Sequence, residues 1–80
     1  MNLEIITPDK KIFAGEATAV TFPGIEGQFQ VLNAHAPLVS TLGAGNLVVE
    51  TDGKKQNYVI DGGVVEVLNN KVLVLAEAIS

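Results

Sequence analysis

Cysteine and arginine are both absent from the sequence, and each absence excludes a class of function. Without cysteine there can be no disulfide framework, no iron–sulfur cluster and no cysteine-ligated zinc. The single histidine, His35, cannot build a metal site that needs several histidine ligands. Because there is no arginine and the lysines form no basic cluster, the electrostatic pattern of nucleic-acid binding is missing. We therefore expect no metal and no nucleic-acid partner.

Long apolar runs and a leader sequence are missing as well. No stretch approaches the 18 or so consecutive apolar residues of a membrane-spanning helix. The first residues, MNLE, have neither the basic start nor the apolar centre of a secretory signal peptide. Any association with a membrane is therefore expected to go through a protein partner.

The composition that remains is that of one small folded domain over residues 1–80. Hydrophobic residues make up 48% of the chain, charged residues 18%, and the net charge is −4. This balance is unlike that of disordered chains, which combine low hydrophobicity with high net charge. It also leaves apolar surface available for a partner, because a domain of this size buries only about 60–65% of its unfolded surface.

The spacing of glycine and proline predicts strands. These residues recur every few positions from Pro8 to Gly63, too closely for ordinary helices, and β-branched residues are abundant between them. Such a pattern is typical of an all-β sandwich or barrel. The expected strands cover residues 3–7, 28–32, 38–42, 47–51, 54–60, 64–68 and 71–75, with one bent strand over 12–14 and 17–22. Gly15 is expected at that bend, and a turn is expected at Pro23-Gly24.

Two hairpins are predicted near the C-terminal end. Asp52-Gly53 is a strong signal for a two-residue turn, and its register places Glu50 opposite Lys55. Asn69-Asn70 predicts a second hairpin, whose register pairs Val67 with Val72 and Val65 with Val74. A bulge or corner at Gly62-Gly63 is expected before it.

The second hairpin is apolar on both faces, whereas a hairpin with one solvated face should alternate polar and apolar residues. Either the domain itself covers both faces, or one face meets a partner. The sequence leaves both alternatives open.

Catalytic constellations are not found in the sequence. Ser40 and Ser80 lie outside any Gly-x-Ser-x-Gly elbow, and the carboxylates do not form a metal-binding loop. Residues 43–45, GAG, lack the third glycine and the helix of a dinucleotide site. We predict no catalytic residues and no cofactor. The turn at residues 50–54, ETDGK, is similar to that of lipoyl carrier domains. A lipoyl- or biotinyl-type carrier with modified Lys54, or an unrelated β-sandwich adaptor, is therefore the alternative interpretation.

Three segments together resemble a known family. Residues 27–38, GQFQVLNAHAPL, are similar to the signature of the F-type ATP synthase epsilon subunit, and residues 58–67 and 72–77 are similar to its second block. Residues 3–8 and 13–15 resemble its first hairpin. Two positions depart from the pattern, since Gln30 replaces a usual glycine and Asn33 a usual proline.

The resemblance implies a flattened, roughly ten-stranded antiparallel β-sandwich, here without the C-terminal helical hairpin of most members. It implies a non-catalytic rotor subunit in the central stalk that links the gamma subunit to the membrane c-ring and so couples ion flow to ATP synthesis. Catalysis would lie on the alpha and beta subunits. The implied location is peripheral, on the cytoplasmic face of a bacterial or equivalent energy-transducing membrane. The isolated chain is expected to be a monomer.

The resemblance also implies contact residues. The c-ring contacts would be Glu26, Gly27, Gln28 and Phe29, and the gamma contacts would be His35, Ala36, Pro37, Leu38 and Ser40. Gln28 can form a hydrogen bond but no ion pair, so Glu26 is expected to carry the charge at this site. Each of these residues also has a purely structural interpretation, in the core or in a turn.

Overall fold

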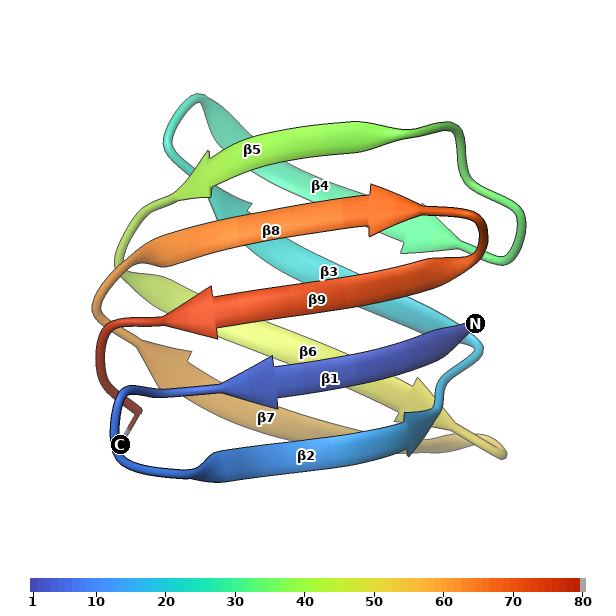
Figure 1. Ribbon diagram of the computed structural model, residues 1–80, viewed down its shortest axis with the longest axis horizontal. Coiled ribbons are helices and arrows are strands. Elements are labelled where there is room, and N and C mark those ends of the chain that lie inside the picture. Colours follow the sequence, from blue (N-terminus) through green and yellow to red (C-terminus); the bar gives the residue numbers. More distant parts are fainter. Residues whose placement is uncertain (80) are drawn as a thin grey trace.

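The computed structural model describes residues 1–79, which form nine strands (Figure 1). The strands are β1 (Asn2–Ile6), β2 (Lys11–Glu16), β3 (Ala19–Gly24), β4 (Gly27–Leu32), β5 (Leu38–Leu42), β6 (Gly45–Thr51), β7 (Lys54–Ile60), β8 (Gly63–Leu68) and β9 (Lys71–Ala76). None of these residues belongs to a helix long and apolar enough to cross a membrane. The predicted all-β sandwich is confirmed.

The strands form two layers, seen one behind the other in Figure 1. The front layer has the order β2-β1-β9-β8-β5, and the back layer has the order β4-β3-β6-β7. At one corner the layers meet through a single pair, Gly24 with Leu42. Near the opposite corner an isolated bridge joins Ile60 to Ile79. The sheet thus curls around a closed interior.

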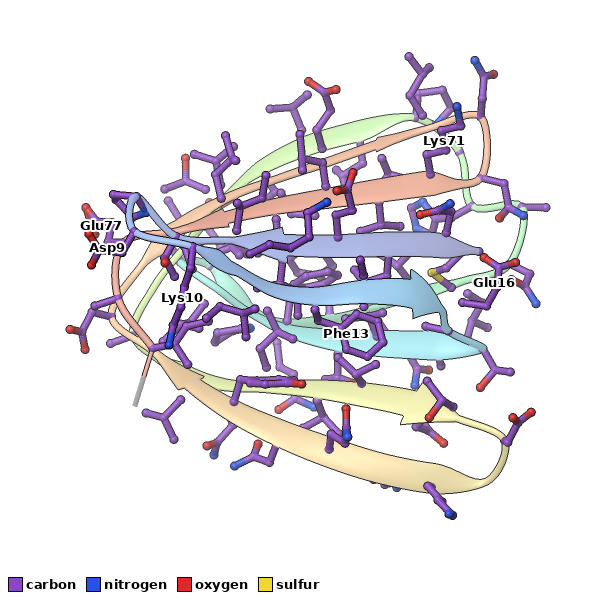
Figure 2. All side chains as sticks on the ribbon, turned by 60° about the horizontal axis from the view of Figure 1, so that its bottom comes forward. Asp9, Lys10, Phe13, Glu16, Lys71 and Glu77 are labelled. Carbon is purple, nitrogen blue, oxygen red and sulfur yellow. The ribbon has the colours of Figure 1, made fainter. Side chains whose placement is uncertain are left out.

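The core fills the space between the layers. Its members are buried and apolar: Met1, Leu3, Ile5, Ala17, Val20, Phe22, Val31, Leu42, Leu47, Val49, Ile60, Val65, Val67, Val72, Val74 and Ala76. The ring of Phe13 also lies between the layers, at the β2 edge (Figure 2). No polar or charged residue among those described is buried. The fold is therefore held mainly by apolar burial and by strand pairing.

Both hairpin predictions are confirmed. Asp52 and Gly53 have φ values of 47° and 76°, as a two-residue turn with positive φ at both centres requires, and Glu50 lies opposite Lys55. Asn69 and Asn70 turn the chain in the same way, with φ values of 51° and 60°. Val67 pairs with Val72 and Val65 with Val74, as predicted.

The bent strand expected over residues 12–22 was wrong, because two strands stand in its place. Gly15 lies inside β2, opposite Leu3. The chain then passes from the front layer to the back, and this crossing is fixed by hydrogen bonds from Ala17 N–H to the Met1 carbonyl and from Thr18 N–H to the Glu50 carbonyl, at 2.9 and 2.8 Å. The pattern of polar and apolar residues along the chain does not show where a strand ends in one layer and the next begins in the other.

Three further details differ from the sequence prediction. The turn expected at Pro23-Gly24 lies at residues 25 and 26, and the Pro23 carbonyl, still in β3, accepts a hydrogen bond from Gly43 N–H at 2.8 Å. The described residues form nine strands instead of about ten. One pair, β1 with β9, is parallel, because the first strand inserts beside the last.

Candidate interaction surfaces

The segment with the single histidine is the loop between β4 and β5, at the same end of the sandwich as Met1 and the β8–β9 turn (Figure 1). His35 N–H donates to the Leu32 carbonyl at 3.2 Å, which closes a turn, and Ala34 within it has a φ of 61°. The imidazole Nδ1 of His35 lies 2.7 Å from the Ala36 carbonyl oxygen. A carbonyl oxygen can only accept, so Nδ1 carries the proton in this hydrogen bond. Ala36 and the following proline are exposed.

The other predicted gamma-contact residues lie on β5. Leu38 is half-buried and packs against the core, and Ser40 Oγ donates to the neighbouring Thr41 carbonyl at 3.3 Å. Between them, Val39 points outward and is 70% exposed. The alternation of strand side chains thus gives an exposed apolar position on β5 to a residue that the sequence did not single out.

The predicted c-ring contacts lie at the tip of the β3–β4 hairpin. Glu26, Gly27 and Gln28 are exposed, whereas Phe29 is half-buried and its ring is stacked on Phe22 with the centroids 5.3 Å apart. Ile25, also missed by sequence reasoning, is 66% exposed beside Glu26.

The tip near Glu26 and the loop that carries His35 lie at opposite ends of the sandwich, and Ser40 lies between them in the middle of β5. Strand β4 begins at the tip of residues 25 and 26 and ends at the loop that carries His35 (Figure 1). Six extended residues span about 20 Å. One chain can therefore contact two different partners at the same time.

A third surface, the outer face of the front layer, is apolar, and we call it the front face. Most of the outward side chains of β5, β8, β9 and β1 are apolar, namely Val39, Val64, Leu68, Leu73, Leu75 and Ile6, and the polar ones are Thr41, Glu66, Lys71, Asn2 and Glu4. In the register, Val64, Leu75 and Ile6 lie side by side across three strands. All three side chains of this row are at least partly exposed to water, and Leu75 is 50% exposed.

The front face resolves the alternatives that the sequence left open for residues 64–75. The inward side chains of this hairpin, such as Val65 and Val74, form the core. The outward side chains of Leu68 and Leu75 are each 50% exposed. The apolar side chains of this hairpin therefore form part of the core on one face and an exposed surface on the other.

Three shallow grooves run over the front face. One of about 420 Å³ is lined by Glu4, Glu66, Leu68 and Leu73 among others. A second of about 370 Å³ lies between Pro37, Val39 and Leu68. A third, about 340 Å³, is lined by Ile6, Pro8 and Leu75. The second groove joins the loop that carries His35 to the front face.

The charges on the front face are few. Glu4 forms the one salt bridge within residues 1–79, with its Oε2 atom 2.9 Å from Nζ of Lys11. Both side chains are about half exposed, so this pair adds little stability. Glu66 lies in register between Val39 and Leu73. Lys71 is the outward residue of β9 next to Leu73 and lines the same groove as Glu66, so the front face presents a few charges of both signs among apolar side chains.

The outer face of the back layer is polar by contrast. Its outward positions include Gln28, Gln30, Thr21 and Asn57, and Asn57 Nδ2 donates to Asn46 Oδ1 at 3.1 Å. Among these polar residues lie the exposed apolar side chains of Leu32 and Val59.

The described residues hold no group of three or more histidine or acidic side chains placed to bind a metal ion. Lys54, on which the carrier alternative rests, begins β7 opposite Thr51, one position beyond the turn at Asp52 and Gly53. The lysine is displaced from the turn tip, so the carrier alternative is not favoured.

Comparison with known proteins gives consistent matches over the whole chain. The family described as "ATP synthase, Delta/Epsilon chain, beta-sandwich domain" matches residues 1–80. An ATP synthase epsilon chain of Nitratidesulfovibrio vulgaris (strain DP4) is 44% identical over 78 residues, which are 98% of this chain and 58% of the relative. An ATP synthase epsilon chain of Chlorobium limicola is 40% identical over 80 residues, or 99% of this chain and 91% of the relative. The chain thus spans little more than half the length of the first relative and most of the second.

Solved structures agree. A chain in the cryo-EM structure of the Euglena gracilis mitochondrial ATP synthase, described as OSCP/F1/c-ring in rotational state 1, has a TM-score of 0.92 and 33% identity over 98% of this chain and 51% of that one. A chain in the central stalk/c-ring structure of the Tetrahymena thermophila enzyme has a TM-score of 0.86 over 99% of this chain and 64% of that one. Its identity of 16% supports the fold alone.

Proposed function

Because this chain belongs to the family of ATP synthase delta/epsilon β-sandwich domains, we propose that it is a non-catalytic part of the central stalk of a rotary ATP synthase. In this role it binds the gamma subunit on one side and the c-ring on another. It thereby helps the rotor to turn as one body and couples ion flow to ATP synthesis. Its place is peripheral to the membrane, on the cytoplasmic face or its equivalent.

The observation that carries this proposal is the uncovered front face. Its exposed leucine and valine side chains are arranged over three adjacent strands instead of being scattered singly. Contiguous apolar surface of this kind marks interaction sites on soluble domains. We assign the gamma subunit to this face, together with the loop that carries His35, because the groove between Pro37 and Leu68 makes the two continuous.

Charge defines the chemistry of the gamma segment that fits. Glu66 has apolar neighbours on both adjacent strands, so a docked partner would remove its carboxylate from water. A buried charge without a partner is costly, so the docked segment should combine apolar side chains with a lysine or arginine opposite Glu66. Lys71 of this chain lines the same groove as Glu66, and a basic group of the partner would add to it.

The tip of the β3–β4 hairpin is suited to a different partner. It lies at the opposite end of the sandwich from His35. Its two turn residues, Ile25 and Glu26, both have exposed side chains. Gly24 keeps the turn tight, because a Cβ there would lie 2.5 Å from the Gly27 carbonyl oxygen. A narrow, rigid tip with one apolar and one acidic side chain can insert between the loops of the c-ring, and we assign the predicted contacts of Glu26, Gly27 and Gln28 to it.

The test is reconstitution with purified gamma subunit and c-ring. We expect the chain to bind gamma alone and to increase the retention of c-ring by gamma. Ala36→Trp should reduce gamma binding by about 100-fold, since a bulky ring at an exposed interface position cannot be accommodated. Circular dichroism should show that this variant keeps its strand content.

Several results would contradict the proposal. Gamma binding that is undiminished in folded Ala36→Trp would remove the loop from the interface. Association of the chain with itself at micromolar concentration, seen by sedimentation, would make a second copy the occupant of the front face. A longer chain whose added residues cover Leu75 in the gamma complex would remove the front face from the gamma interface.

A further inference from the structure

We propose that Asn70, in the turn between β8 and β9, is a positioning residue that holds the His35 loop in its partner-binding conformation. The inference rests on the proposed gamma interface and names a residue outside that interface's predicted contacts. It starts from an unusual backbone conformation next to His35.

Ala34 stands at a position that glycine or asparagine would normally occupy. The hydrogen bond from His35 N–H to the Leu32 carbonyl closes a four-residue turn, in which Ala34 is the third residue. Its φ of 61° is the positive value that the third position of a type II turn demands. An alanine in this region is strained by its Cβ, so interactions outside the turn have to hold it there.

Asn70 supplies such an interaction. Its side-chain Oδ1 accepts a hydrogen bond from Ala34 N–H at 2.9 Å, across 36 positions of sequence. Its own carbonyl accepts from Asn2 N–H at 3.0 Å. Asn70 therefore joins the loop that carries His35 to the β8–β9 turn and to the start of β1.

The geometry explains why asparagine suits this place. The φ of Asn70 is 60°, a conformation that asparagine tolerates better than most residues, and its short amide reaches Ala34. Asn69 is its counterpart in the same turn, with φ 51°, and none of the described hydrogen bonds joins its side chain to the loop. The two residues share a positive φ, and their side chains differ in this contact with the loop.

The position of the loop matters for the front face because Pro37 forms one wall of the groove against Leu68. Leu68 in turn ends β8, directly before the Asn69-Asn70 turn. A loop released from Asn70 would change both the exposure of His35 and the width of this groove.

The experiment compares Asn70→Gly with Asn69→Gly in the full chain. Both substitutions keep the positive φ, and only the first removes the acceptor of Ala34 N–H. We expect amide exchange at Ala34, measured by NMR, to become about tenfold faster in Asn70→Gly, and gamma affinity to fall about fivefold. Asn69→Gly should change each within about twofold. Asn70→Asp, which keeps an acceptor and tolerates the same backbone, should restore both readouts.

Two results would overturn the inference. Asn70→Gly with faster exchange at Ala34 but unchanged gamma affinity would show that the loop needs no such support to bind. Failure of Asn70→Asp to restore exchange or affinity would show that the side-chain acceptor is not the cause. The proposed function is tested separately by Ala36→Trp, whose failure to reduce gamma binding would count against the interface itself.

Discussion

The hairpins β6–β7 and β8–β9 are built on the same backbone plan. Each begins with a glycine at a φ of 152°, Gly45 in the first and Gly63 in the second. Each reverses through two residues with positive φ, Asp52 with Gly53 and Asn69 with Asn70. Their local geometry alone would not distinguish them.

The two hairpins differ in where they lie and in what they turn outward. β7 is the end strand of the back layer and pairs only with β6, and the outward side chains there are mostly polar, with Glu50 opposite Lys55. β8 and β9 lie between β5 and β1, and their outward side chains include Leu68 and Leu75. The comparison teaches that the turn fixes the register, whereas the outward positions decide whether a hairpin meets water or another protein.

The largest difference is expected from the first glycines. A Cβ on Gly63 would lie 2.3 Å from the Leu75 carbonyl oxygen, which is backbone, whereas a Cβ on Gly45 would lie 2.9 Å from the Pro23 side chain. Gly63→Ala should therefore lower the free energy of unfolding by about 3 kcal/mol or more, and Gly45→Ala by about 1–2 kcal/mol. Urea denaturation followed by circular dichroism measures both values.

Equal losses of unfolding free energy in Gly63→Ala and Gly45→Ala would contradict this prediction. That outcome would mean that strain at positive φ, which the glycines share, outweighs the overlap with the Leu75 backbone. A Gly63→Ala chain that is already unfolded in water agrees with the prediction, provided that Gly45→Ala still folds.

The strands and hairpins were predictable where local chemistry decides them. Asp-Gly and Asn-Asn each favour two-residue turns, and these turns fix which residues pair across the strands. Which face of residues 64–75 points inward was not predictable, because both faces are apolar. The layer crossing at Ala17 and Thr18 was not predictable, because its hydrogen-bond partners are Met1 and Glu50, residues 16 and 32 positions away in the chain. Gly15 looked like a bend for the same reason, since a glycine inside a strand and one at a corner give the same local signal.

The candidate sites were predictable in part. The segment that carries His35 and the tip near Glu26 were found through their resemblance to a family, and both lie in exposed turns. Val39 and Ile25 were missed, because only the pleat of β5 and the position of the turn reveal that they point outward. The hydrogen bond between Asn70 and Ala34 joins two turns that are far apart in sequence, so no local sequence pattern predicts it.

The second difference concerns binding. Leu75 on β9 is 50% exposed and Val59 on β7 is 41% exposed, so the two offer matched outward apolar positions on the two hairpins. Leu75→Lys should weaken gamma binding by at least about 100-fold, or about 2.7 kcal/mol, because it places a charge in the middle of the apolar row. Val59→Lys should leave the affinity within about twofold. Isothermal titration with purified gamma gives both numbers.

The stability of the two lysine variants is the control for this binding test. Both side chains already contact water, so each variant should unfold within about 1 kcal/mol of the parent chain. An equal loss of gamma affinity in Val59→Lys would assign the interface to both layers, and an unchanged affinity in Leu75→Lys would remove it from the front face.

The smallest difference is expected at the turns, and it tests whether they are as alike as their φ values indicate. Asparagine adopts positive φ more readily than aspartate, and Asn-Gly is a strong two-residue hairpin signal. Asp52→Asn should therefore stabilise the chain by about 0.3 kcal/mol, and Asn69→Asp should destabilise it by a similar amount. Both positions are exposed, so the substitutions change neither the core nor the front face. Urea midpoints measured side by side in high salt, where charge effects are screened, should shift in opposite directions. If Asn69→Asp lowers the free energy of unfolding by more than about 1 kcal/mol, the β8–β9 turn contributes to stability in a way that the β6–β7 turn does not. The hydrogen bond between Asn70 and Ala34 would then be the structural source of this difference.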